Sequence, residues 1–284
     1  MVNGLFLGAI YALAAIGFVL IHNVSGSVNF SHGALVLLGT YLGVMYVDIA
    51  SVSMWLVLVL VALTMVGIGM LLELVAFRPL EGKPFVAVFI STLALGLIIA
   101  QVILLVWGPR PRAGTALVRG QLTVGSVTVP NQGLIILGLT LAVVAAQWVM
   151  FHRTRIGIRL RATADDSVTA SMMGIRTGRN RLLVFGIAAA LAGVAGVLIA
   201  PLSFVDPSRG GIDIMIKIYI AVVIGGFGSE VGAAAGGIVL GLAEVLTAGY
   251  LSATYRDVII YSLLIAVLVL RPSGLFGQPT LREA

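Results

Sequence analysis

Residues 3–33 read NGLFLGAIYALAAIGFVLIHNVSGSVNFSHG, an apolar run that ends in a polar, glycine-containing stretch. The apolar part, 3–21, has the length of about 20 residues that a helix needs to cross a bilayer. No Lys, Arg, Asp or Glu occurs in the first 47 residues, yet serines, asparagines and histidines are concentrated at 22–32. At membrane depth such groups are tolerated where they satisfy one another or the backbone. The stretch therefore predicts a membrane-spanning helix followed by a helix break at 25–33.

The whole chain has the composition of a membrane protein. Of its 284 residues 60% are hydrophobic and 10% are charged, with a mean hydropathy of +1.14. Soluble domains average about 25% charged residues. Long apolar runs without strand-like alternation favour helices over a β-barrel. We therefore predict an all-α, polytopic transmembrane helix bundle of about 8–10 spans, with broken helices, in which residues 1–284 form one domain.

Nine apolar segments are candidate spans, and two of them are short. The first lacks a basic leader region and a cleavage site, so we expect it to be a retained span rather than a signal peptide. The nine segments are 3–21, 33–49, 53–75, 85–107, 131–151, 182–200, 213–226, 232–248 and 257–270.

Basic residues divide the loops into two sets. Loop 152–181 carries seven arginines against two aspartates, and the link 77–84 and the C-terminal tail add Arg78, Lys83, Arg271 and Arg282. These make up most of the 17 basic residues, and loops rich in Lys and Arg stay in the cytoplasm. We therefore expect loop 152–181 and the C-terminus to be cytoplasmic, whereas charge does not fix the side of the N-terminus.

The loops expected on the opposite side are 48–52, 108–130, 201–212 and 249–256. Within the second of these, the β-branched alternation QLTVGSVTV at 121–129 predicts a small hairpin lying on the membrane surface.

Glycine is abundant, with 35 residues, and it often recurs four positions apart. This spacing makes a smooth stripe on which transmembrane helices approach closely. The pairs Gly4/Gly8, Gly39/Gly43, Gly232/Gly236 and Gly237/Gly241 therefore predict dense packing of a polytopic bundle.

The longest hydrophilic stretch, 153–181, predicts a short amphipathic helix. Thr163 could cap it, Asp165 and Asp166 would lie in its first turn, and Gly174 would end it. The stripe formed by Ala164, Val168 and Met172 could lie on anionic lipid or dock in the groove of a soluble partner. The many small residues favour protein docking, because lipid insertion favours bulky side chains.

Five segments that follow one another along nearly the whole chain carry a family resemblance. They are NGLFLGAIYALAAIGFVLI (3–21), GSVNFSHGALVLLGTYLG (26–43), RTRIGIRLRATADDSVTASMMGI (153–175), GGFGSEVGAAAGGIVLGLAE (225–244) and RPSGLFG (271–277). Together they resemble the membrane permease subunits of bacterial ABC importers for branched-chain amino acids. The similarity is greatest to the H-type of the two paired permeases.

The resemblance implies a permease subunit of the bacterial inner membrane that imports leucine, isoleucine or valine. Its implied partners are two ABC ATPase subunits, a homologous M-type permease and an extracytoplasmic substrate-binding protein docking on 108–130 and 201–212. ATP and Mg would be bound by the ATPase subunits, with no cofactor on this chain and no nucleic-acid partner. The implied coupling helix lies within 161–175. The matching positions are Arg161, Ala162, Ala164, Asp165, Asp166, Ala170, Gly174 and Ile175.

Two glycine-containing interruptions, NFSHG at 29–33 and GGFGS at 225–229, share a similar design. Transporters often place broken helices of corresponding repeats beside the substrate path. The alternative interpretation is that these residues only satisfy backbone groups freed by the breaks. The candidate path or gate residues are Asn29, Phe30, Ser31, His32, Gly33, Gly225, Gly226, Phe227, Gly228 and Ser229.

Ionisable residues at membrane depth suggest a second transport class. Asp213 and Lys217 are four residues apart and could pair on one helix face. A secondary transporter driven by an ion gradient would use Asp213, Glu230 or Glu244 as its ion site. Related ABC permeases for urea or short amides are a further alternative.

Other chemistries find little support in the sequence. GGFGSEVG at 225–232 lacks the Lys-Ser/Thr ending of a phosphate-binding loop. The three histidines lack a metal-ligand spacing, and the absence of cysteine excludes disulfides and thiolate metal sites. An intramembrane hydrolase using Ser31 and His32 is disfavoured, because neighbours on a helix do not face each other.

Overall fold

The computed structural model describes residues 2–50, 53–112, 114–118, 120–124, 127–202, 205–209, 211–251, 254–271 and 273–276. Parts of the predicted outer segments 108–130 and 201–212, and the end of the tail with Arg282, lie outside the described residues.

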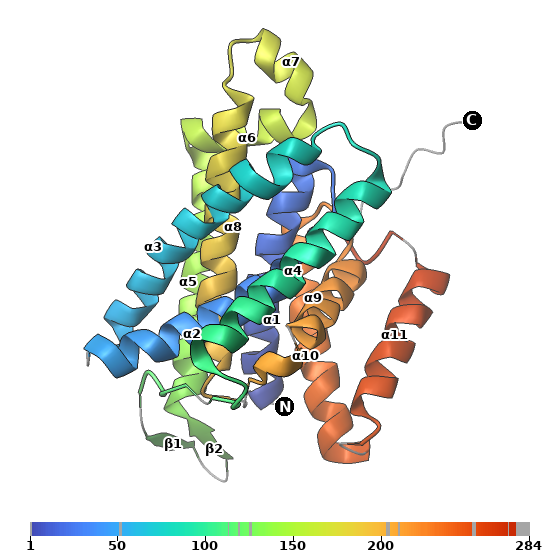
Figure 1. The fold of residues 1–284 in the computed structure, drawn as a ribbon. Helices are drawn as coiled ribbons and strands as arrows, with labels where there is room; N and C mark the ends of the chain where they lie inside the picture. Colours follow the sequence, from blue (N-terminus) through green and yellow to red (C-terminus); the bar gives the residue numbers. More distant parts are fainter. Residues whose placement is uncertain are drawn as a thin grey trace.

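The described residues form helices joined by short links, with one two-stranded sheet (Figure 1). The predicted all-helical membrane bundle is therefore confirmed. The α-helices are α1 (Val2–Ser25), α2 (His32–Ala50), α3 (Met54–Leu72), α4 (Phe85–Trp107), α5 (Asn131–Arg153), α6 (Arg155–Asp165), α7 (Ser167–Met172), α8 (Thr177–Ile199), α9 (Ile212–Gly225), α10 (Glu230–Leu246) and α11 (Arg256–Leu270). The remaining elements are η1 (Glu73–Phe77), η2 (Arg78–Leu80), η3 (Pro207–Arg209), η4 (Thr247–Leu251), β1 (Gln121–Val124) and β2 (Val127–Pro130).

Seven of the described helices are long and apolar enough to cross a membrane. The predicted spans at 213–226 and 257–270 correspond to α9 and α11, which have 14 and 15 residues. At about 1.5 Å per residue α9 is roughly 21 Å long, less than the ~30 Å of a bilayer core. α9 therefore has the length of a partial span, as a broken helix does.

The core is built around α1, which is buried along most of its length and packs against α5, α8, α9 and α10. Large apolar side chains on α3, α4, α5 and α11 face outward instead. Examples are Trp55, Leu105, Leu141 and Leu270. This distribution is expected when the solvent around the bundle is lipid.

Glycines set the distance between α1 and α10. A Cβ added to Gly237 would lie 2.4 Å from the backbone nitrogen of Ala12, and one on Gly241 would lie 2.2 Å from that of Gly8. Gly39 meets Gly193 of α8 in the same way. The close packing predicted from the four-residue glycine spacing is therefore confirmed.

The two ends of the bundle carry different segments (Figure 1). α6, α7 and the link after η2 lie at one end, and the start of α1 lies at the other with β1 and β2. The predicted hairpin is confirmed, with Thr123 opposite Thr128 in an antiparallel register. An isolated bridge joins Arg112 to Val205, so the segment between α4 and α5 contacts the segment between α8 and α9.

Candidate functional site

The polar side chains in the helix break after α1 form hydrogen bonds within the protein. The Asn29 Oδ1 accepts hydrogen bonds from the Ser31 backbone nitrogen at 3.0 Å and from its hydroxyl at 2.6 Å. The His32 Nε2 lies 3.0 Å from the Ala14 carbonyl oxygen, which can only accept, so this nitrogen donates. All three side chains are buried. They therefore satisfy groups inside the protein, and Ser31 and His32 form no nucleophile–base pair.

The contact with Ala14 also places the start of α2 halfway along α1. There it meets the start of α9. A Cβ on Gly33 would lie 2.3 Å from the Gly211 carbonyl oxygen, and one on Gly211 would lie 2.6 Å from that of Gly33. Gly211 has φ +73°, which favours glycine. Sequence reasoning missed Gly211, although a glycine directly before an apolar helical segment was a visible signal.

An apolar groove of about 380 Å³ lies between α4 and α9, beside this junction. We call it the apolar groove. Among the candidate path residues, Phe30 lines it and contacts Phe89 of α4 edge to face at 4.7 Å. Its other lining residues include Ala34, Leu93, Leu97, Met215 and Tyr219.

The second break, between α9 and α10, is a tight glycine turn. Gly226 and Gly228 have φ of +106° and +83°, and the Ser229 hydroxyl accepts from the Gly232 nitrogen to cap α10. Gly225 packs directly on Gly232. These residues therefore hold α9 and α10 together.

Aromatic rings connect the two breaks. Tyr219 lies 6.5 Å from Phe30 and 5.7 Å from Phe227, measured between ring centroids. Phe227 in turn contacts His22 at 5.4 Å, and the Asn23 amide donates to the Gly228 carbonyl at 3.1 Å. The two predicted interruptions are thus brought near each other through Tyr219, which sequence reasoning did not select.

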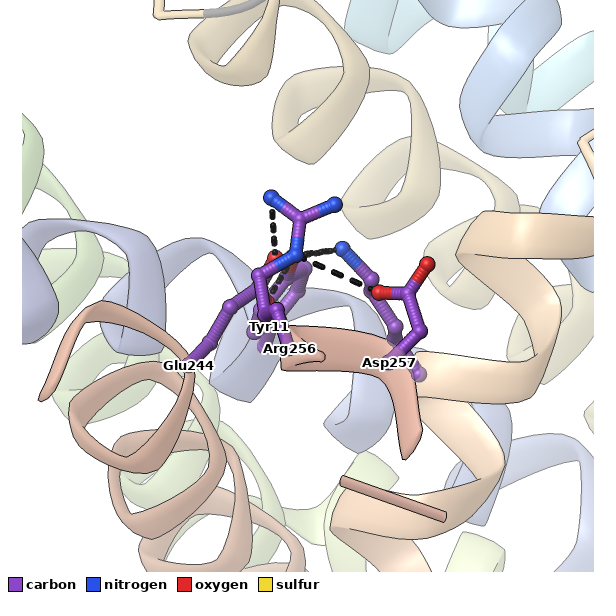
Figure 2. A network of polar contacts seen from close by, with 5 residues as sticks. Tyr11, Glu244, Arg256 and Asp257 are labelled. Atoms are coloured by element: carbon purple, nitrogen blue, oxygen red, sulfur yellow. Dashed lines mark hydrogen bonds and ion pairs between the residues drawn. The ribbon is translucent and has the colours of Figure 1, made fainter. Parts of the chain in front are cut away.

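A charged network joins α1, α9, α10 and α11 (Figure 2). Lys217 Nζ is 2.6 Å from Glu244 Oε1, and it also donates to the Tyr11 hydroxyl at 3.1 Å. Tyr11 donates to Glu244 Oε2 at 2.8 Å, and Arg256 Nη1 lies 3.5 Å from Glu244 Oε1. Arg256 Nε also donates to Asp257 at 3.2 Å. Lys217, which by its spacing could pair with Asp213, is held by Glu244 of another helix, a contact that i, i+4 spacing cannot reveal.

The network borders a cavity of about 680 Å³ that we call the outer cavity. Its charged lining consists of Lys217, Glu244, Arg256, Asp206 and Asp213. Its apolar lining includes Phe6, Leu7, Leu37, Ile199, Leu202 and Ile214. Gly211 lines both the outer cavity and the apolar groove, so the Gly33–Gly211 junction lies next to both.

The predicted amphipathic helix at the opposite end is divided in two. Thr163 does not cap a helix: it is buried inside α6, where its hydroxyl donates to the Arg159 carbonyl and accepts from Asn180 at 2.8 Å. Asp166 breaks the helix and caps α7 by accepting from the Val168 and Thr169 nitrogens. The predicted single helix was wrong because Asn180 of α8 fixes Thr163 by a long-range contact.

Electrostatics at the Asp166 cap favour the ionised carboxylate. The Thr169 hydroxyl, together with the backbone N–H groups of Thr169 and Val168, lowers the pKa of Asp166. The cap is therefore charged at neutral pH, next to the positive end of α7.

α7 projects from the end of the bundle (Figure 1). Val168, Met172 and Met173 are 61%, 80% and 79% exposed, whereas Ala170 is buried against the protein. Gly174 ends the helix with φ +79°, as predicted. Of the other candidate coupling residues, Arg161, Asp165 and Asp166 are exposed and Ala162, Ala164 and Ile175 are partly buried. α7 therefore presents an apolar, uncovered tip.

Comparisons with known proteins find relatives that span the whole chain. Residues 1–268 match the family described as "Branched-chain amino acid transport system / permease component". The chain is 35% identical to the high-affinity branched-chain amino acid transport system permease protein LivH of Escherichia coli K12, covering 100% of this chain and 96% of the relative. It is 31% identical, with the same coverage, to the permease protein BraD of Pseudomonas aeruginosa. A probable branched-chain amino acid transport permease of Methanocaldococcus jannaschii is 26% identical over 93% of the chain. No solved structure matches significantly.

The fold and these matches define a multi-pass membrane permease of the ABC transporter class. The chain belongs to the family of branched-chain amino acid transport system permease components. It is a permease subunit and not itself an ATPase, and the alternative of a self-sufficient, ion-driven transporter is set aside.

Proposed function

We propose that this chain forms the translocation path for leucine, isoleucine or valine together with a homologous M-type permease. Two separate ABC ATPase subunits, which bind ATP and Mg, drive the transport. The cargo follows from the family match, and the single observation that carries the coupling to ATPases is the exposed apolar tip of α7 at the arginine-rich end of the chain. A short helix with uncovered Val168, Met172 and Met173 fits a groove on a soluble partner.

The positive-inside rule then orients the molecule in the bacterial inner membrane. The end with α6 and α7 is cytoplasmic, because it carries the arginines of loop 152–181. The N-terminus and the hairpin are extracytoplasmic. The substrate-binding protein docks there on 108–130 and 201–212, whose described parts are joined by the Arg112–Val205 bridge.

The path itself runs beside the two helix breaks. The apolar groove, with Phe30 and Tyr219 in its wall, suits the branched side chain of the cargo. Asn29, Ser31, His32 and Gly33 position Phe30 and close the junction with Gly211. Gly225, Gly226, Phe227, Gly228 and Ser229 hold the cytoplasmic end of α9 as a gate element.

Cargo competition in a reconstituted complex tests this proposal. The chain, its partner permease and the ATPases are placed in proteoliposomes with the binding protein and labelled leucine. Excess unlabelled valine or isoleucine should abolish ATP-dependent uptake of the label, and urea or acetamide should leave it unchanged. Uptake of urea or acetamide in place of leucine would overturn the assigned cargo.

A further inference from the structure

We propose that the outer cavity is an acceptor site for the free amino acid zwitterion. It would take the cargo from the binding protein before the cargo reaches the apolar groove. This inference rests on the proposed function and adds a site that none of the candidate path residues forms. Recognition would use the carboxylate, the ammonium group and the aliphatic side chain at once.

The cation side of the site comes from two helices that meet at one carboxylate. Lys217 of α9 and Arg256 of α11 both approach Glu244 Oε1, at 2.6 and 3.5 Å. A guanidinium has five N–H donors, and the described contacts of Arg256 engage Nε and Nη1. The side chain of Arg256 remains 39% exposed, and Figure 2 shows it reaching over Glu244. Arg256 can therefore bind a ligand carboxylate without releasing Glu244.

The anion side lies in the same lining. Asp206 and Asp213 border the cavity together with Glu244. A carboxylate has about four acceptor positions, so each can accept an ammonium donor in addition to its protein contacts. An amino acid carries its two charges only a few bonds apart. A cavity lining with both positive and negative charges therefore complements a zwitterion better than a simple anion or cation.

The apolar lining of the outer cavity would bind the third part of the ligand, its aliphatic side chain. Phe6 and Leu7 of α1, Leu37 of α2 and Ile199 of α8 face the same space as the charged groups. The volume of about 680 Å³ is within the range of roughly 300–1,000 Å³ typical of small-molecule sites. A branched aliphatic side chain can therefore be buried while the charged head stays at Arg256.

The position of the cavity gives the site its place in transport. It is bordered by Pro130, Leu202, Val205 and Asp206, which belong to or adjoin the segments on the hairpin side of the bundle. Gly211 lines this cavity and also the apolar groove. Cargo in the outer cavity is thus separated from the groove by the Gly33–Gly211 junction.

The test is equilibrium binding of labelled leucine to the complex of both permeases and the ATPases in lipid nanodiscs, without binding protein or ATP. Leu202→Trp fills the cavity without touching the charged network. Leu251→Trp is the matched control, on an exposed residue outside the cavity lining. Arg256→Gln is a second variant, which removes the carboxylate donor.

We expect wild type and Leu251→Trp to bind leucine equally. Leu202→Trp should lose one site per complex, and Arg256→Gln should weaken that site at least tenfold. Leucinamide and 4-methylpentanoate, which each lack one charge, should compete at least tenfold less well than leucine. The proposed site is wrong if the wild-type complex shows no saturable leucine binding. It is also wrong if both cavity variants bind leucine as the wild type does. ATP-dependent leucine uptake is measured in parallel. If the proposed function is wrong, the wild-type complex itself shows no uptake, whereas failure of the proposed site alone leaves wild-type uptake intact.

Discussion

At the scale of single residues, the polar groups after α1 serve the backbone. Asn29, Ser31 and His32 are buried and bonded to protein atoms, while Phe30 between them lines the apolar groove. Backbone freed from a helix in lipid must find partners inside the protein. The polar stretch at 25–33 therefore positions one aromatic side chain and the Gly33–Gly211 junction.

Gly33→Ala should destabilise the protein because its Cβ would lie 2.3 Å from the Gly211 carbonyl oxygen and 2.6 Å from the Met215 Cβ. Overpacking of this kind costs about 1–3 kcal/mol. We expect a thermal midpoint several degrees lower in detergent. Gly67→Ala, where an added Cβ meets nothing within 4 Å, is the control and should show no loss. Equal thermal midpoints for the two variants would show that the Gly33–Gly211 junction shifts to accommodate the added Cβ.

Met172→Asp should weaken docking of the ATPase subunits. It places a charge on a side chain that is 80% exposed and that the proposed interface would bury. We expect at least a tenfold loss in the affinity of the ATPases for the purified permease pair, with normal membrane insertion. Met172→Leu keeps an apolar side chain and should retain binding. Unchanged affinity for Met172→Asp would remove α7 from the interface.

At the scale of elements, α8 is tied to the end of α3 beneath α7. Arg181 of α8 is buried and forms ion pairs with Glu73 of η1, at 3.7 Å, and with Glu81. These residues line a polar cavity of about 490 Å³ that also includes Ser167 at the start of α7. We propose that motion of α7 is passed to α8, which α7 contacts, and from α8 to α3.

Arg181→Gln should therefore lower both stability and coupling. It leaves the buried Glu73 carboxylate without its cation, and breaking such a pair costs about 3 kcal/mol or more. A lower thermal midpoint and fewer substrate molecules moved per ATP hydrolysed are expected. Arg179→Gln changes an exposed arginine two residues away and should match wild type in both assays. If the Arg181 variant moves as many substrate molecules per ATP as the wild type, the proposed transmission from α7 through α8 to α3 is contradicted.

At the scale of the whole molecule, the sequence predicted the helical class, the hairpin and the dense glycine packing, because each depends on a local period or spacing. It could not predict that Gly33 meets Gly211, or that Lys217 pairs with Glu244 of another helix. The split between α6 and α7 was missed for the same reason, since Thr163 is bonded to Asn180. Such contacts depend on which helices become neighbours.

Sidedness can be measured cleanly because the chain has no cysteine. Leu122→Cys on β1 should react with a membrane-impermeant maleimide added to intact spheroplasts, since the hairpin is extracytoplasmic. Ser171→Cys on the exposed face of α7 should react only in inside-out vesicles. The opposite labelling pattern would reverse the orientation and place the arginine-rich end outside.

The energy source of uptake tests the central claim most directly. Proteoliposomes that hold this chain, its partner permease and the ATPases receive leucine-loaded binding protein, and leucine entry is measured with ATP present and a protonophore added. As an ABC permease subunit, the chain should support entry that continues with the protonophore and stops when the ATPases are omitted. Entry that persists without the ATPases and collapses with the protonophore would contradict the account.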